Sequence, residues 1–279
     1  VSLGGSGLCA TSKDLLILMM LVAGNGNING TQYLPEDYMK DAKAKHSDPV
    51  ANQGTWEEMQ GYGYQIWLSR HGGNALFGMG GQLALYIPDQ DIYMITTADA
   101  QGRQGGVQLI YDAFYEEIYD KLNGESTYKA PDMTLEQFIN SRHIVTLEGN
   151  KTSSYVDKIN HKVYECDNNA NGYKTFKIDI DDNDCGSVTY TTESGTHTIC
   201  FGINKGVTGE FPEYGFRYVA DAAWRMDNYL LIRVNIIDSD VGNLYIGMNY
   251  KDDYVTVVLK KVLEYKLDEF SDVFSGRCN

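Results

Sequence analysis

The stretch from Leu76 to Thr97, LFGMGGQLALYIPDQDIYMITT, constrains the fold more than any other part of this sequence. It opens with a glycine cluster at positions 78–81, and an alternating run follows. In that run Leu83, Leu85 and Ile87 face one way, and Ala84 and Tyr86 face the other. Pro88-Asp89 supplies a turn, and Ile92 to Thr97 has the β-rich composition of a second strand. The pattern predicts a β-hairpin with a glycine-rich entry, where the backbone can approach a neighbouring group closely.

Charge excludes one class of partner. The chain carries 23 Lys+Arg against 38 Asp+Glu, a formal net charge of −15. Residues 1–124 hold 7 basic and 14 acidic side chains, so the acidity is spread over the chain and is not a tail. A polyanion would be repelled, and we therefore expect no nucleic-acid partner. A hydrophobic content of 43% supports folded cores.

The start of the chain looks internal to a longer protein. The first residue is Val1, and the following SLGGSG resembles the middle of a loop. No signal peptide is visible, and the longest apolar run, Leu15 to Val22, is too short to span a bilayer. We interpret the chain as a fragment or a processed product. Its localisation is not readable from its start, with a bacterial-type cytoplasm slightly favoured.

Neither the cysteines nor the histidines have the spacing of a metal site. The five cysteines form no CxxC pair, which favours reduced structural thiols, although a bridge among Cys166, Cys185 and Cys200 stays open for a secreted protein. The DIDDNDCG run begins like a calcium loop, but Asp184 stands where glycine is needed. It is better explained as a hairpin turn. We predict no metal and no cofactor.

Two helices flank the hairpin in the sequence. Thr11 or Ser12 can cap a helix that runs to about Ala23, and a shorter helix is predicted around 35–45. YGYQIWL at 62–68 is typical of a strand. Val107 to Leu122 forms an amphipathic helix whose apolar stripe can pack on the hairpin, giving an antiparallel sheet backed by helices.

The residue pattern changes at 123–131 (NGESTYKAP), and we predict the domain boundary there. Beyond it, short strands separated by Asn, Asp and Gly turns are predicted at 173–180, 187–192, 197–201, 216–222, 229–236, 244–249 and 254–261. This spacing is typical of a β-sandwich or a small barrel. The predicted fold class is α+β: residues 1–124 form an antiparallel sheet with packing helices, and residues 125–279 form an all-β domain.

Several segments of the first domain resemble the C-terminal half of the serine β-lactamase-like family, which includes penicillin-binding proteins. They are LGGSGLCATSKDLLILMMLVAGNG, YGYQIW, FGMGGQLALYIPDQDIYMITTAD and GGVQLIYDAFYEEIYDKL. The second domain is similar to the β-rich appendage of some family members, mainly through RYVADAAWRMDNYLLIRVNIID. The resemblance implies a partial β-lactamase-like fold in residues 1–124.

The resemblance also implies a chemistry whose main parts lie upstream of Val1. The family's Ser-x-x-Lys nucleophile motif is absent here, so no catalytic residue is assigned. The family's third motif, which lines the substrate cleft, would fall at Gly78, Met79, Gly80, Gly81 and Gln82, with Met79 or Gly80 in place of its Lys or His. A shifted alignment would instead use His71-Gly72-Gly73. Ser126 to Lys129 matches Ser-x-x-Lys literally, but it lies in a linker before Pro131.

Two functions follow from the resemblance. The chain is expected to be the C-terminal portion of a serine hydrolase acting on an ester, amide or peptide-like substrate, inactive without its missing N-terminal half. The alternative is a non-catalytic protein that binds cell-wall peptide or glycan on the same scaffold. Loss of that half would leave the 92–97 strand as an open edge and favour a homo-oligomer. The 21 tyrosines suggest an aromatic binding surface, although buried strand tyrosines are commoner.

Overall fold

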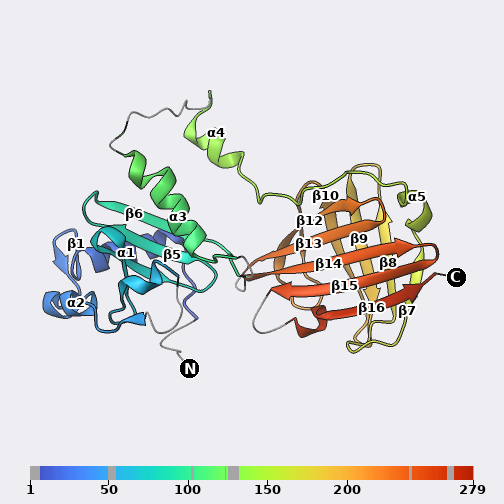
Figure 1. Cartoon of the computed structure of the whole chain (residues 1–279), viewed down its shortest axis with the longest axis horizontal. Helices are drawn as coiled ribbons and strands as arrows, with labels where there is room; N and C mark the ends of the chain where they lie inside the picture. The colour runs from blue at the N-terminus through green and yellow to red at the C-terminus, as the bar shows by residue number, and fades with distance from the viewer. Residues whose placement is uncertain are drawn as a thin grey trace. The chain divides into compact units, whose positions relative to one another are not determined.

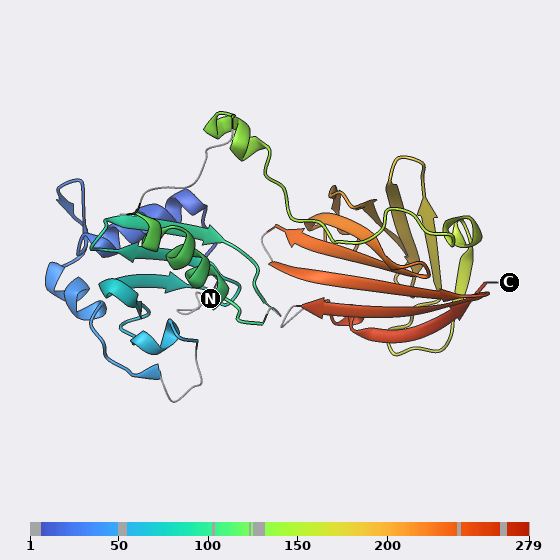
Figure 2. The ribbon, with the colours of Figure 1, turned by 45° about the horizontal axis from the view of Figure 1, so that its top comes forward.

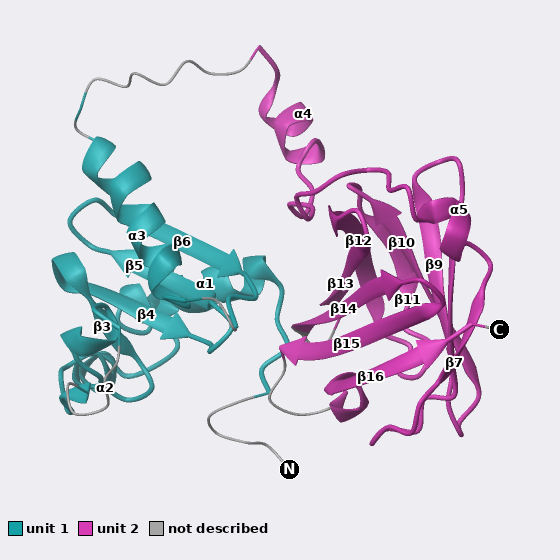
Figure 3. Ribbon diagram, turned by 45° about the vertical axis from the view of Figure 1, so that its right-hand side comes forward, with its two compact units in different colours: residues 1–130 teal, residues 131–279 magenta. Residues whose placement is uncertain are grey.

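The computed structural model describes residues 7–49, 55–101, 104–122, 124, 132–238, 241–262 and 267–278. The chain divides into two compact units, residues 1–130 and 131–279 (Figure 3). Most of the predicted boundary at 123–131, including Ser126 to Lys129, lies outside the described residues, as does most of the opening SLGGSG.

The first helix of unit 1 forms as its sequence predicts. α1 spans Ser12–Ala23, and its N-cap is Thr11. The Thr11 hydroxyl accepts a hydrogen bond from the backbone N–H of Asp14, and the Asp14 carboxylate accepts one from the backbone N–H of Thr11. This reciprocal capping box satisfies backbone donors that a helix start otherwise leaves unpaired.

A four-stranded antiparallel sheet lies at the centre of unit 1 (Figure 1). Its order is β3 (Trp67–Ser69), β4 (Gly73–Phe77), β5 (Gln82–Ile87) and β6 (Ile92–Thr97). β5 and β6 pair from Gln82↔Thr97 to Ile87↔Ile92, which confirms the predicted hairpin. The strand predicted at 62–68 is shorter and later than expected, and β4 was not predicted.

Each face of this sheet packs against a helix. Leu83, Leu85 and Ile87 of β5 pack with Tyr111 and Phe114 of α3 (Gln108–Glu117). The opposite face, which includes Ala84, packs with Met19 of α1 and with α2 (Glu36–Ala42). The two-residue strands β1 (Asn27–Ile28) and β2 (Thr31–Gln32) form a small hairpin after α1. The predicted alternation of β5 and the predicted contact with the 107–122 helix are both confirmed.

Unit 2 is built from short helices and a large curved sheet (Figures 1 and 2). The helices are α4 (Leu135–Asn140), α5 (Val156–Ile159) and the 3-10 turn η5 (Asp268–Phe270). The strands are β7 (Val163–Cys166), β8 (Thr175–Ile180), β9 (Cys185–Thr191), β10 (Thr196–Ile203), β11 (Val207–Glu210), β12 (Arg217–Met226), β13 (Tyr229–Ile237), β14 (Val241–Lys251), β15 (Tyr254–Val262) and β16 (Asp272–Arg277). Seven of these strands match predicted ones, whereas β7, β11 and β16 were not predicted.

The sheet closes into a barrel where β10 meets β12. The strands follow the order β10-β9-β8-β7-β16-β15-β14-β13-β12, and Gly202 and Ile203 of β10 then pair in parallel with Asp221 and Ala222 of β12. The chain turns sharply after β10, so that β11 runs antiparallel to the first residues of β12. A Cβ at Gly202 would lie 2.4 Å from the Lys205 carbonyl oxygen, so this turn requires glycine.

A strap on the outside of the barrel joins α4 to α5. Asp221 and Arg233 project from the outer faces of β12 and β13 and form a buried ion pair, with Arg233 Nε 3.0 Å from Asp221 Oδ1. Asp221 also accepts a hydrogen bond from the backbone N–H of Leu147, and Arg233 donates one to the carbonyl of Val145. The pair therefore fixes the 145–149 strap to the barrel wall.

The coarse fold class is confirmed: the protein is α+β and contains a β-barrel domain. A β-sandwich is not formed, and a partial β-lactamase fold is contradicted. The DIDDNDCG run is the β8–β9 turn, in which Asp181 Oδ1 accepts hydrogen bonds from the backbone N–H groups of Asn183 and Cys185. None of the helices in the described part of the chain has the length and apolar composition of a bilayer span.

Candidate functional site

The predicted cleft residues Gly78 to Gln82 form a tight turn between β4 and β5. The Gly78 N–H donates to the Gln82 carbonyl over 2.7 Å, and the Gly81 N–H donates to the Gly78 carbonyl over 2.8 Å. Strand β5 begins at Gln82, so the glycines precede the strand that they were expected to start. Met79 projects from this turn with 61% of its surface exposed.

The contacts of this turn are with the chain itself. Gly81 has φ +90°, and a Cβ there would lie 2.6 Å from Ile110 Cδ1 of α3, so glycine allows α3 to approach. The Gln82 amide donates to the Ala98 carbonyl over 3.2 Å. His71, the alternative motif residue, adopts φ 58° within the 3-10 turn η3 (Arg70–Gly72), and its ring lies 4.2 Å from that of Tyr119.

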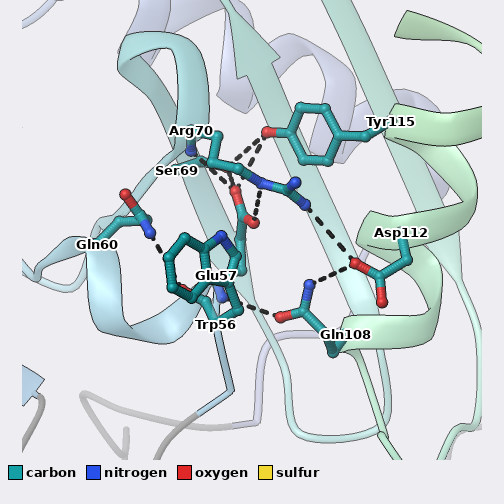
Figure 4. Close-up of polar contacts among 8 residues, drawn as sticks. All are labelled: Trp56, Glu57, Gln60, Ser69, Arg70, Gln108, Asp112 and Tyr115. Atoms are coloured by element: carbon teal, nitrogen blue, oxygen red, sulfur yellow. Dashed lines mark hydrogen bonds and ion pairs between the residues drawn. The ribbon is translucent and has the colours of Figure 1, made fainter. Parts of the chain in front are cut away.

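A buried carboxylate, Glu57, lies at the centre of a polar cluster in unit 1 (Figure 4). Arg70 donates its backbone N–H and its Nε to the two carboxylate oxygens, each over 2.8 Å. The Ser69 hydroxyl donates to Oε1, and the Tyr115 hydroxyl donates to the same oxygen over 3.2 Å. The Arg70 guanidinium also lies over the Tyr115 ring, 3.9 Å from its centroid.

The Glu57 cluster joins three segments and does not present a reactive group. The Glu57 backbone N–H donates to Gln108 of α3, while Ser69 and Arg70 lie at the end of β3. The Ser69 side chain is buried, and its hydroxyl proton is directed to a carboxylate. Burial and the nearby Glu57 charge raise the pKa of Tyr115, which keeps it a protonated donor. We therefore interpret this cluster as a structural pin.

The barrel of unit 2 encloses a strongly apolar interior. Because strand residues alternate between faces, every second residue of β12 to β15 points inward, and the buried apolar members of this set line the interior. They are Tyr218, Ala220, Ala222 and Trp224, then Leu230, Ile232, Val234 and Ile236, then Leu244, Ile246, Met248 and Tyr250, then Val255, Val257 and Leu259. Aromatic side chains from β8, β9, β10 and η5 complete this core.

One end of the barrel, here called the Glu213 end, carries a polar cluster beneath aromatic residues. Glu213 lies in the loop between β11 and β12, and its Oε2 accepts a hydrogen bond from the Tyr190 hydroxyl over 2.7 Å. Burial raises the pKa of the Glu213 carboxyl. Nearby, the Tyr214 hydroxyl donates to Glu269 over 2.9 Å; burial and this contact raise the pKa of Tyr214 to about 12. Phe211 and Phe270 pack together over the interior.

Ser194, His197 and Glu213 have the composition of a hydrolytic triad but not its geometry. The Ser194 hydroxyl lies 3.1 Å from His197 Nε2, and Glu213 Oε1 lies 3.7 Å from the same nitrogen. A triad needs the acid on one ring nitrogen and the nucleophile on the other, so that the acid orients the base. With both oxygens at Nε2, the cluster is not arranged for acyl transfer.

The opposite end of the barrel, here called the Trp224 end, contains the buried donors of Trp224 and Tyr250, and the buried ring of Tyr164 lies 5.9 Å from that of Tyr250. Trp224 is 1% exposed, and its Nε1 is buried without a hydrogen-bond partner in the described structure. The Tyr250 ring lies 6.5 Å from the Trp224 ring, and its hydroxyl donates to Met248 Sδ over 3.5 Å. A thioether sulfur is a weak acceptor, so neither donor has a good partner.

Trp224 differs from the other unpartnered groups. In the described chain such atoms also occur in four residues that are only partly buried: Asn25, Thr55, Arg70 and Asn204. Those atoms are themselves buried, but other atoms of the same residues reach the surface, and Arg70 Nη2 lies 3.7 Å from Asp112 Oδ1. The Trp224 N–H, by contrast, lies in the barrel core, where an unpaired donor costs about 1–3 kcal/mol.

Comparisons with known proteins give structural likeness alone. No family model matches the chain, and no curated protein matches it. A fatty-acid-binding protein from Drosophila melanogaster brain is 14% identical, with a TM-score of 0.33, covering 43% of this chain and 98% of its own. Lipid binding protein 8 of Caenorhabditis elegans is 8% identical, with a TM-score of 0.36, covering 46% of this chain and 99% of its own. The Manduca sexta fatty-acid-binding protein is 16% identical, with a TM-score of 0.32, covering 43% and 99%.

These comparisons contradict the predicted membership of the serine β-lactamase-like family. The similar structures named above are fatty-acid- or lipid-binding proteins, and no family model or curated protein matches the chain as a hydrolase. The predicted serine hydrolase, its peptide-like substrate, its missing N-terminal half and the cell-wall-binding alternative on that scaffold are corrected with it. So is the oligomer through the 92–97 edge, which was inferred from the missing half. The physical reason is that a glycine turn, a hairpin and a backing helix are general solutions for covering an antiparallel sheet.

Proposed function

We propose that residues 131–279 form a binding module that holds a small, mostly apolar ligand inside the barrel. The observation that carries this proposal is the Trp224 N–H, a fully buried donor in an apolar interior without an acceptor in the described chain. Buried polar groups in native proteins are almost always paired. An acceptor supplied by a ligand would satisfy this donor.

The architecture supports the same proposal. Eight-stranded barrels can be filled by side chains or hold one small ligand, and the diameter grows with the number of strands. Here nine strands close the ring, and two of the inward positions of β12 are the small residues Ala220 and Ala222. Apolar and aromatic walls with a few placed polar groups are typical of ligand sites. The proposal rests on this interior and not on the names of the similar structures.

Titration of the full chain with Nile red, a neutral apolar dye, tests the proposal. We expect saturable binding at one site per chain, with dye emission that reports an apolar environment. Trp224→Phe should weaken binding about three- to tenfold, because one hydrogen bond contributes about 0.5–1.5 kcal/mol. The matched control is Tyr245→Phe, since Tyr245 lies on the outer face of β14. Emission that never saturates, or equal affinities for both variants and the parent chain, would overturn the proposal.

A further inference from the structure

The donors at the Trp224 end are both neutral. An indole N–H is a donor that never ionises in the physiological range, and burial raises the pKa of Tyr250 well above its ordinary value, so its hydroxyl stays protonated. The two rings are neighbours, and Met248 is the sole described acceptor of the Tyr250 hydroxyl. Trp224 and Tyr250 therefore offer hydrogen-bond donors to the interior without a positive charge.

The cationic side chains described at the Trp224 end are exposed and do not enter the interior: Arg225 donates to the Glu148 carbonyl, and Arg277 lies over the Tyr254 ring. Of the residues described in unit 2, the buried charged ones are Asp221 and Arg233, which are paired on the outer face. Lys261 lies toward the Glu213 end, where its Nζ pairs with Asp268. A carboxylate placed beside Trp224 would consequently be a buried charge without a counter-ion. The desolvation of such a charge costs several kcal/mol.

The Glu213 end adds a second barrier to anions. Glu213 is largely buried there, and Glu269 accepts the hydrogen bond of Tyr214 close by. The chain as a whole carries a formal net charge of −15. Lys261 also lies at this end, but it is paired with Asp268, so the carboxylates outnumber it. Together with the negative overall charge they disfavour an anionic ligand and leave a neutral one unaffected.

We propose that the barrel selects a ligand with a neutral hydrogen-bond acceptor, such as a ketone, ester or ether oxygen, which Trp224 and Tyr250 bind together, and that it discriminates against carboxylates. The inference rests on the proposed ligand-binding function and names the chemical class of that ligand. Trp224 and Tyr250 act as the specificity-determining residues, while the apolar walls supply most of the affinity.

Three naphthalenes of nearly equal shape separate the contributions by calorimetry on the full chain at pH 7. They are 2-acetylnaphthalene, with a neutral acceptor, 2-ethylnaphthalene, with none, and 2-naphthoate, with a charged one. The ketone should bind about three- to tenfold more tightly than the hydrocarbon, the value of a single neutral hydrogen bond. It should bind about a hundredfold more tightly than the carboxylate, whose charge must be buried unpaired.

Two variants test whether Trp224 and Tyr250 cause the preference for the ketone over the hydrocarbon. Trp224→Phe and Tyr250→Phe should each reduce the advantage of the ketone over the hydrocarbon to about twofold or less, while the hydrocarbon itself binds about as before. Tyr245→Phe, on the outer face, should change neither affinity. Circular dichroism verifies that each variant is folded.

The outcomes distinguish the inference from the function beneath it. If 2-naphthoate binds as tightly as 2-acetylnaphthalene, or if the ketone keeps its advantage in Trp224→Phe, the inference on ligand class is overturned and the binding function stands. If none of the three compounds gives a saturable heat of binding, the proposed function is overturned as well.

Discussion

Glu57 in unit 1 and Trp224 in unit 2 are equally buried, each with 1% of its surface exposed, and their surroundings are opposite. The Glu57 carboxylate receives hydrogen bonds from Ser69, from Tyr115 and twice from Arg70. The Trp224 N–H has no acceptor in the described chain. The same rule, that buried polar groups need partners, therefore gives two conclusions. A group whose partners all come from the fold stabilises the fold, and a group without them points to a ligand.

The largest effect is expected when the fully hydrogen-bonded carboxylate of Glu57 is removed. Glu57→Ala should destabilise unit 1 by about 3–5 kcal/mol, because Arg70, Ser69 and Tyr115 lose a shared buried partner. Denaturant unfolding followed by circular dichroism measures the loss. Glu116→Ala, at an exposed position of α3, is the matched control. A cost below about 1 kcal/mol, the scale of surface substitutions, would show that the cluster is not a structural pin.

Removing a second buried charge, that of Asp221, tests whether the ion pair holds the 145–149 strap on the barrel wall. Asp221→Asn should cost about 2–4 kcal/mol, because Arg233 then remains buried without a counter-ion and the 145–149 strap loses its anchor. Limited proteolysis should also cut the strap sooner. Glu148→Gln changes an exposed side chain of the same strap and should alter neither stability nor cleavage. Equal behaviour of the two variants would refute the role of the ion pair.

The smallest effect is expected at the Glu213 end and depends on pH. Burial raises the folded-state pKa of Glu213, so the folded chain binds this proton more readily than the unfolded chain. Its contribution to stability is therefore present at low pH and is lost as the pH rises through the raised pKa. The groups that face Glu213 are Tyr190, His197 and Glu269.

A His197→Gln background removes the imidazole that faces Glu213, so that the Glu213 carboxyl can be compared with its amide. In it, the chain that keeps Glu213 should gain stability relative to Glu213→Gln as the pH falls from about 7 toward the ordinary range of a glutamate. Thermal unfolding across this interval provides the measurement. A relative stability that falls with decreasing pH would have the wrong sign and contradict the assigned cause.

Local patterns predicted the parts of the fold that depend on neighbouring residues. Thr11 and Asp14 are three positions apart, and this spacing suffices to cap a helix. The alternation from Leu83 to Ile87 assigned each side chain of β5 to its face, because the period of a strand is two residues. The 107–122 stripe likewise predicted the face of α3, although the α-helix itself ends at Glu117.

Features that depend on distant residues were missed. Glu57 meets Tyr115 across 58 positions, and no short motif joins them. β10 closes the barrel onto β12 through two residue pairs, and β16 reaches β7 through two, which are too few to leave a sequence pattern. Tyr218, Ala220, Ala222 and Trp224 do alternate in the sequence, so an inward row on β12 was readable. The sequence did not show that the Trp224 N–H would lack an acceptor.

The indole N–H of Trp224 provides the most direct test of this account. The chain has three tryptophans, so a ¹H–¹⁵N spectrum of the full chain contains three indole signals, and Trp224→Phe identifies one of them. Addition of 2-acetylnaphthalene should shift the Trp224 signal downfield to saturation as its N–H gains an acceptor, and should leave exposed Trp56 unmoved. A Trp224 signal that stays fixed while the ligand saturates the protein would contradict the claim that this donor binds the ligand.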